Sequence, residues 1–196
     1  DVLDGLQPMR GEAVGSSAVA SHLRAAKGHM ALAVAVADIA GVWPMERVTG
    51  ALSDFAEAVL GCAAATLLRE TAAAGVITLA TPGDPERESG LVVLGMGKLG
   101  ARELNYSSDI DLVILYDHER MRTPKPDELH NHMVRLARNL VRLMEERTAE
   151  GYVFRTDLRL RPDPGSTPPA ISVLAAETYY ESLGQNWERA AMIKAR

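Results

Sequence analysis

The pattern of hydrophobic and polar positions divides the chain into a helical first part and a second part in which strands and helices follow one another. In the first part, Ala, Leu and Val fill the stretches 16–40 and 45–74, and polar residues recur on one side of each, which predicts two helices. The stretch 81–90 is rich in Pro, Gly and charge and predicts a loop. We place a domain boundary in this loop, between a helical segment 1–82 and a second domain 83–196.

The second domain is expected to combine short strands with helices of different lengths. Strands are predicted at 91–95, 111–116 and 152–162. Helices or helical turns are predicted at 98–105, 126–151, 173–183 and 186–196. The helix 126–151 has an apolar stripe at helical spacing, and Asp127 is expected to cap its N-terminus.

The composition argues against several classes of protein. The 196 residues have a net charge of −5 and a pI near 5.6, so a general nucleic-acid surface, which is basic, is not expected. The single cysteine, Cys62, cannot form a disulfide within the chain, which favours the cytoplasm. The apolar stretch 30–43 is shorter than the about 20 residues of a membrane span, and no signal peptide is visible. The chain begins without Met and ends at Arg196 inside a predicted helix, which indicates a fragment of a longer protein.

Two acids stand at the entrance of the second predicted strand. Asp109 and Asp111 are two residues apart, so on a strand they point to the same side, with Cα atoms about 6–7 Å apart. Carboxylates at this spacing can converge on divalent cations. The pattern by itself is a weak signal, and acids that face water at a strand entrance are its commoner meaning.

The third predicted strand adds a further acid and two arginines. One face is expected to carry Val153, Arg155, Asp157, Arg159 and Arg161. The other face, expected to be core, carries Tyr152, Phe154, Thr156, Leu158 and Leu160. If this strand lies beside the second, Asp157 becomes a third carboxylate, and Arg159 and Arg161 can each bind phosphate oxygens through two donors. The alternative is a solvated face in which Asp157 pairs with Arg159 or Arg155.

The turn after the first strand completes a candidate phosphate-binding cradle. The sequence GMGKLG, residues 95–100, follows the strand and provides Gly97 and Lys98, and the hydroxyls of Ser107 and Ser108 precede Asp109. The same glycines match a dinucleotide-binding pattern. We disfavour that interpretation because the helix after the glycines is poor in apolar residues and the acids would have no role.

These residues resemble a known family. The sequence LGMGKLGARELNYSSDIDLVILYD resembles the signature of glutamine synthetase adenylyltransferases, whose catalytic halves belong to the nucleotidyltransferase superfamily. FRTDLRLRPDPGSTPPAIS resembles the family's third-carboxylate segment, and the match covers residues 90–196. The resemblance implies an α+β fold with a short mixed sheet, preceded by a helical segment. Gly97 and Lys98 stand where the superfamily has Gly-Ser, so Lys98 or Ser107 is expected to replace that serine.

The resemblance also implies a reaction. One half of these enzymes attaches AMP from ATP to a tyrosine of glutamine synthetase, and the other removes it by phosphorolysis and gives ADP. YYESLGQNWERAAMIKAR resembles the adenylyl-removing half. The alternatives are the adenylylating half and a catalytically silent regulatory module. The implied partners are adenylylated glutamine synthetase, phosphate, ADP or ATP and, for a full-length enzyme, a PII-type signal protein.

The resemblance finally implies roles for particular residues. The carboxylates expected to hold Mg²⁺ or Mn²⁺ and to take part in catalysis are Asp109, Asp111 and Asp157. The residues expected to bind nucleotide or phosphate are Gly97, Lys98, Ser107, Ser108, Arg159 and Arg161.

Overall fold

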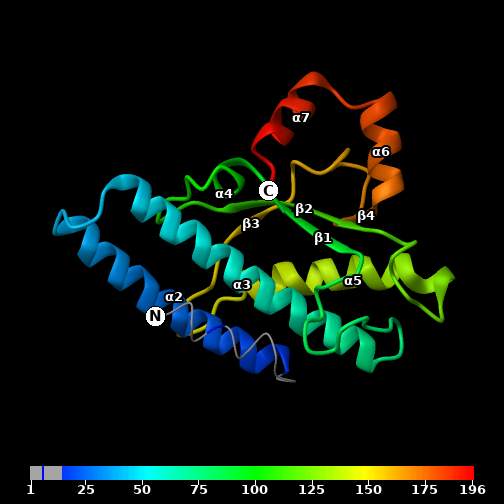
Figure 1. Ribbon diagram of the computed structural model, residues 1–196, viewed down its shortest axis with the longest axis horizontal. Coiled ribbons are helices and arrows are strands. Elements are labelled where there is room, and N and C mark those ends of the chain that lie inside the picture. Colours follow the sequence, from blue (N-terminus) through cyan, green and yellow to red (C-terminus); the bar gives the residue numbers. More distant parts are fainter. Residues whose placement is uncertain (1–5, 7–14) are drawn as a thin grey trace.

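Two long helices form the first part of the chain, as the sequence predicts. The computed structural model describes Leu6 and residues 15–196, so the other residues of the predicted helical segment 1–82 lie outside the described part. Helix α2 (Ser16–Ile39) packs along helix α3 (Met45–Ala73), as Figure 1 shows. By length and composition α3 could cross a membrane, yet 72% of its most apolar stretch is buried in the molecule, as in a core helix.

The second part is built around a mixed sheet of four strands. Strand β1 (Leu91–Gly95) runs antiparallel to the central strand β2 (Ile110–Tyr116). Strands β3 (Thr156–Asp157) and β4 (Ala170–Ser172) pair in parallel with successive parts of β2. Helices and a small mixed sheet therefore form the α+β fold that the sequence predicts.

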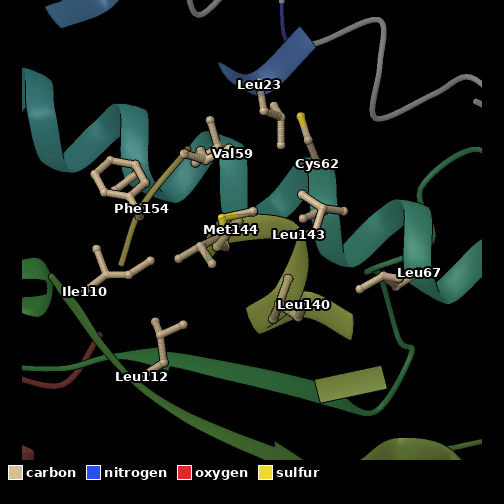
Figure 2. Close-up of a cluster of buried hydrophobic side chains, with 14 of the residues drawn as sticks. Leu23, Val59, Cys62, Leu67, Ile110, Leu112, Leu140, Leu143, Met144 and Phe154 are labelled. Atoms are coloured by element: carbon tan, nitrogen blue, oxygen red, sulfur yellow. The ribbon is translucent and has the colours of Figure 1, made fainter. Parts of the chain in front are cut away.

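The two faces of the sheet have different surroundings. Helix α3 and helix α5 (Pro126–Glu145) lie on one side, whereas α6 (Val173–Ser182) and α7 (Asn186–Ala191) rise on the other (Figure 1). Figure 2 shows Ile110 and Leu112 of β2 in the cluster with side chains of α3 and α5. Because strand residues alternate, Asp111, Val113 and Leu115 point to the α6–α7 side.

The hydrophobic core is continuous across the predicted domain boundary. Val59 of α3, Leu140 of α5 and Leu112 of β2 belong to the same buried cluster. Nothing in the arrangement tests the division at residues 82 and 83, which stays a prediction.

The prediction for residues 152–162 was wrong in extent and in facing. The strand is reduced to Thr156 and Asp157, and Val153 is fully buried beside the equally buried Phe154, although the two were predicted on opposite faces. The reason is local: the N–H groups of both residues donate to the carbonyl of Met144, at 3.0 Å each, so the chain folds around the end of α5 instead of extending.

Several other element boundaries also differ from the prediction. Helix α5 ends at Glu145 and not at 151. Pro126 takes the first helical position, which Pro favours, so the N-cap residue is Lys125 and Asp127 does not cap the helix. Helix α4 covers only Gly97–Gly100. The segment 186–196, predicted as one helix, instead forms the short helix α7 and then the 3₁₀ turn η2 (Met192–Lys194). Strand β4 was not predicted, since three residues after a Pro-rich loop carry no periodic pattern.

Substitutions at two glycines can test whether η2, near the end of the chain, packs against α4. A Cβ on Gly100 would collide with the backbone carbonyl of Lys194, whereas one on Gly28, exposed on α2, would meet nothing within 4 Å. Gly100→Ala should therefore lower the free energy of unfolding by about 1–3 kcal/mol. Gly28→Ala should raise it by about 0.5–1 kcal/mol, because Ala is the better helix former. Urea unfolding measures both, and a neutral Gly100→Ala would show that η2 does not lie against α4.

Candidate active site

The centre of the candidate site is a pair of carboxylates on neighbouring strands. Asp111 of β2 and Asp157 of β3 are direct partners in the parallel register. The sequence-based expectation that these two segments lie side by side is thus met. Asp109 stands just before β2 and is exposed, whereas Asp111 is half-buried. Burial raises the pKa of Asp111, and the negative charges of Asp157 and Asp109 raise it further.

A guanidinium group neutralises the second carboxylate. The Nε of Arg159 donates to Asp157 Oδ2 at 2.8 Å and to Oδ1 at 3.0 Å, and its backbone N–H donates to Oδ1 at 2.8 Å. These bonds from Arg159 lower the pKa of Asp157 below its ordinary value. This contact is the Asp157–Arg159 pairing that the sequence left open as an alternative. Arg159 otherwise remains open to ligands, because its side chain is 84% exposed.

The turn after β1 lies directly against Asp111. Gly97 has a φ of +54°, and a Cβ there would come within 2.7 Å of Asp111 Oδ2, so only glycine leaves room for this carboxylate. Lys98 is exposed, and its positive charge lowers the pKa of Asp111 against the larger raising effects. The structure therefore brings Gly97 and Lys98 to the carboxylates, as predicted for a cradle.

The serine loop before β2 is held in shape by Asn105, which the sequence analysis missed, and by Arg155, which it placed on the face of Asp157 without predicting a contact with this loop. Asn105 Oδ1 accepts hydrogen bonds from Ser108 Oγ at 2.7 Å and from the Ser107 N–H at 3.3 Å. Arg155 donates from Nη2 to the carbonyl of Ser107 at 2.6 Å. The order Asn-x-Ser-Ser is a local signal for such a turn. The contact of Arg155 had no sequence signal, because it depends on the pairing of β2 with β3.

Arg161 is not brought to the carboxylates. Its guanidinium donates to the carbonyls of Leu158 at 2.9 Å, Pro164 at 2.7 Å and Thr167 at 3.0 Å, which closes the loop after β3. A role of Arg161 in phosphate binding stays a prediction, and it would require these bonds to be exchanged.

The carboxylates of Asp111 and Asp157 are of the chemical type that binds a hard divalent cation, but in the structure Asp157 is paired with Arg159. Carboxylate oxygens are the ligands that Mg²⁺ prefers. The pKa of Asp111 is raised first by burial and then by the negative charges of Asp157 and Asp109, and a bound cation would lower it again. Within Leu6 and residues 15–196, no three His, Cys, Asp or Glu side chains are grouped so as to hold a metal. The carboxylate of Asp157 is turned to the guanidinium of Arg159.

The fold and the site together define a class of protein. A small mixed sheet on helices, with acids at the start of its central strand and on the strand beside it, is the core expected of a nucleotidyltransferase. The sequence model of the family described as glutamate-ammonia ligase adenylyltransferase matches residues 6–196. The chain belongs to this family.

Individual relatives agree with the family assignment. The chain is 53% identical over 191 residues to the bifunctional glutamine synthetase adenylyltransferase/adenylyl-removing enzyme of Rhizobium meliloti, which covers 95% of the chain and 19% of the relative. It is 50% identical to the enzyme of the same name from Agrobacterium fabrum over 196 residues, which covers 100% of the chain and 20% of the relative. The chain thus spans about a fifth of the length of these relatives.

The electrostatics of Asp111 lead to a stability prediction. Because the pKa of Asp111 is raised in the folded chain, its ionisation works against folding as the pH rises through that value. Asp111→Asn removes this cost. The melting temperature in EDTA should therefore rise at about pH 7, and the gain should shrink as the pH falls toward the ordinary value of 3.8. Asp109→Asn, at an exposed position, should give a smaller gain. Circular dichroism melts measure both, and a lower melting temperature for Asp111→Asn near neutrality would contradict a cost of ionising Asp111 in the folded chain.

Proposed function

We propose that this site is metal-dependent and removes the adenylyl group from the modified tyrosine of glutamine synthetase by phosphorolysis, giving ADP. The observation that carries the proposal is the direct register of Asp111 with Asp157, with Gly97 and Lys98 against them. The names of the relatives contain both adenylyl transfer and adenylyl removal. The choice of removal depends on the resemblance of residues 179–196 to the adenylyl-removing half.

In the proposed reaction, an oxygen of inorganic phosphate attacks the phosphorus of AMP from the side opposite the tyrosine. The new P–O bond forms as the bond to the tyrosine oxygen breaks, and tyrosine leaves as the anion that then takes a proton. Negative charge is spread over the phosphoryl oxygens during this exchange, so positive groups placed around it lower the barrier. Mg²⁺ or Mn²⁺ held by Asp109, Asp111 and Asp157 would supply most of that charge.

The chain itself contributes positive groups. Arg159 is 84% exposed beyond its contact with Asp157, so its guanidinium can turn to phosphate oxygens when the carboxylate is engaged elsewhere. Lys98 lies close enough to Asp111 to affect its pKa and is exposed, so it can reach the same oxygens. Arg155 keeps the Ser107–Ser108 loop in place through the Ser107 carbonyl.

The adenylylating reaction is the second candidate. It is supported by the description of the family, which names adenylyl transfer. The same residues would serve it, because both reactions pass through the same kind of pentacoordinate phosphorus. In a cytoplasmic full-length enzyme, a PII-type signal protein is the proposed regulator of the choice.

Removal of single carboxylates tests the metal site. Asp109→Asn, Asp111→Asn and Asp157→Asn should each lower turnover by about 100-fold or more, because each loses charge at the phosphoryl group. Asp127→Asn makes the same change at an exposed position in the first turn of α5 and should leave turnover unaltered. Turnover and circular dichroism should be measured on the same samples. Near-normal turnover in a folded Asp111→Asn variant rules out the site.

The direction of reaction is tested by its products. A domain that contains this chain, given adenylylated glutamine synthetase, phosphate and Mg²⁺, should release ADP and unmodified enzyme. The measurement is chromatographic detection of ADP, with phosphate omitted as the control. If the domain instead consumes ATP, modifies glutamine synthetase and releases pyrophosphate, the adenylylating half is the correct assignment.

A further inference from the structure

Strand β3 carries one of the two paired carboxylates but is only two residues long. Thr156 is the register partner of Ile110, and Asp157 is that of Asp111. The N–H of Ile110 donates to the carbonyl of Arg155 at 2.9 Å, which ties the start of β3 to β2. Register is strongly specified where one face of a strand is buried, whereas both residues of β3 are only half-buried. Contacts from outside the sheet are therefore needed to fix where Asp157 lies.

The outer side of β3 is bound by a carboxylate. Strand β3 lies at the end of the β1-β2-β3 path, and the carboxylate takes the place of a next strand. The backbone N–H of Thr156 donates to Glu145 Oε1 at 2.9 Å, and the Thr156 hydroxyl donates to the same oxygen at 2.7 Å. Hydrogen bonds to a charged acceptor are the stronger kind. One oxygen atom thus holds both the backbone and the side chain of the residue directly before Asp157.

The residue that supplies this carboxylate is itself anchored in the core. Glu145 is the last residue of α5 and follows Met144, which is fully buried. The carbonyl of Met144 accepts the N–H groups of Val153 and Phe154. Figure 2 shows Met144 and Phe154 in the cluster that contains Ile110 of β2. A negative side chain at the C-terminal end of a helix interacts unfavourably with the helix dipole, so Glu145 does not stabilise the helix that carries it.

The other contacts of this segment do not replace the contact with Glu145. Phe154 is buried, but it stands three residues before Asp157. The bonds from Arg159 to Asp157 join residues of the same segment, so they move with it and cannot fix it against β2. The guanidinium of Arg155 donates to a carbonyl of the serine loop at 2.6 Å, which ties β3 to the approach of β2. The carboxylate of Glu145 acts on the opposite side of the strand.

We propose that Glu145 is a positioning residue, which acts through Thr156 to keep β3 paired with β2 and so holds Asp157 beside Asp111. Its consequence for catalysis rests on the proposed function, because transfer of a phosphoryl group requires the groups around it to be held in place. Without the carboxylate of Glu145, the N–H and the hydroxyl of Thr156 turn to water. Strand β3 then separates from β2 for a larger fraction of the time, and Asp157 leaves the site with it.

Amide hydrogen exchange in the 196-residue chain, followed by NMR, tests the pairing directly. The N–H of Ile110 reports on the pairing of β2 with β3. The N–H of Met96, which donates to the carbonyl of Asp111 at 2.8 Å, reports on the other side of β2. Glu145→Ala should speed exchange at Ile110 about tenfold, because two hydrogen bonds are lost, and should leave Met96 within twofold of the parent chain. Glu145→Gln keeps an acceptor oxygen at the same reach and should restore the parental rate.

The matched control is Glu146→Ala, the same change at the next residue. Glu146 is exposed as Glu145 is, and its N–H donates to the carbonyl of Arg142 at the end of α5. This variant should leave exchange at Ile110 unaltered. In a domain that contains this chain and releases ADP, Glu145→Ala should lower kcat about five- to tenfold with KM within twofold, and Glu145→Gln should restore kcat.

The outcomes distinguish this inference from the proposed function. Parental exchange at Ile110 in a folded Glu145→Ala variant overturns the inference. Equal acceleration at Ile110 and Met96 shows a general loss of stability and overturns it as well. Faster exchange at Ile110 alone, restored in Glu145→Gln, supports it, unless turnover of the same variant is unaltered, which overturns the positioning role. A parent domain that releases no ADP counts against the proposed function, and the exchange result then decides by itself whether Glu145 holds the pairing.

Discussion

The parallel pairing of β2 with β3 is the constraint on which the candidate site depends, because it holds two carboxylates side by side. Asp111 and Asp157 are direct partners in this pair. Two like charges at such a spacing repel each other, and the burial of Asp111 adds to the cost of its charge. A pair of this kind forms only where other contacts fix the two strands.

Those contacts come from the opposite face of the sheet. Ile110, Leu112 and Ile114 of β2 are almost completely buried against the helices. Burial of each such side chain contributes roughly 1.5–3 kcal/mol, so together they exceed what a partly solvated pair of charges costs. Thr156 of β3 is anchored as well, since its N–H and hydroxyl both donate to Glu145 at the end of α5, at 2.9 and 2.7 Å. The apolar face thus determines where the charged face lies.

On the charged face of the sheet, positive side chains lie near the two carboxylates. Arg159 neutralises Asp157, and Lys98 acts on Asp111 from the turn after β1. In the proposed reaction a metal ion would take over the carboxylates, and the two cations would serve the phosphate oxygens instead. The ion pair of Asp157 with Arg159 would then be the arrangement of the ligand-free site, and it would open when metal and substrate bind.

The sequence by itself determined the two long helices, strands β1 and β2 and the acids of the site. These features depend on local periodicity and on the spacing of Asp109 and Asp111, which the order of residues fully specifies. The resemblance to the family was also read from the sequence, and the match of the family's sequence model to residues 6–196 confirms it.

Only the tertiary structure decided how the segment after α5 runs and what its side chains contact. Val153 and Phe154 are both buried because they wrap the end of α5, and Arg161 donates to loop carbonyls instead of facing the acids. Neither outcome follows from alternation, since alternation holds only where strand pairing keeps the backbone extended. The contact of Glu145 with Thr156 belongs to the same category, because it depends on how the chain folds around the end of α5. Residue order fixes local repeats, whereas contacts between distant segments fix which residues meet.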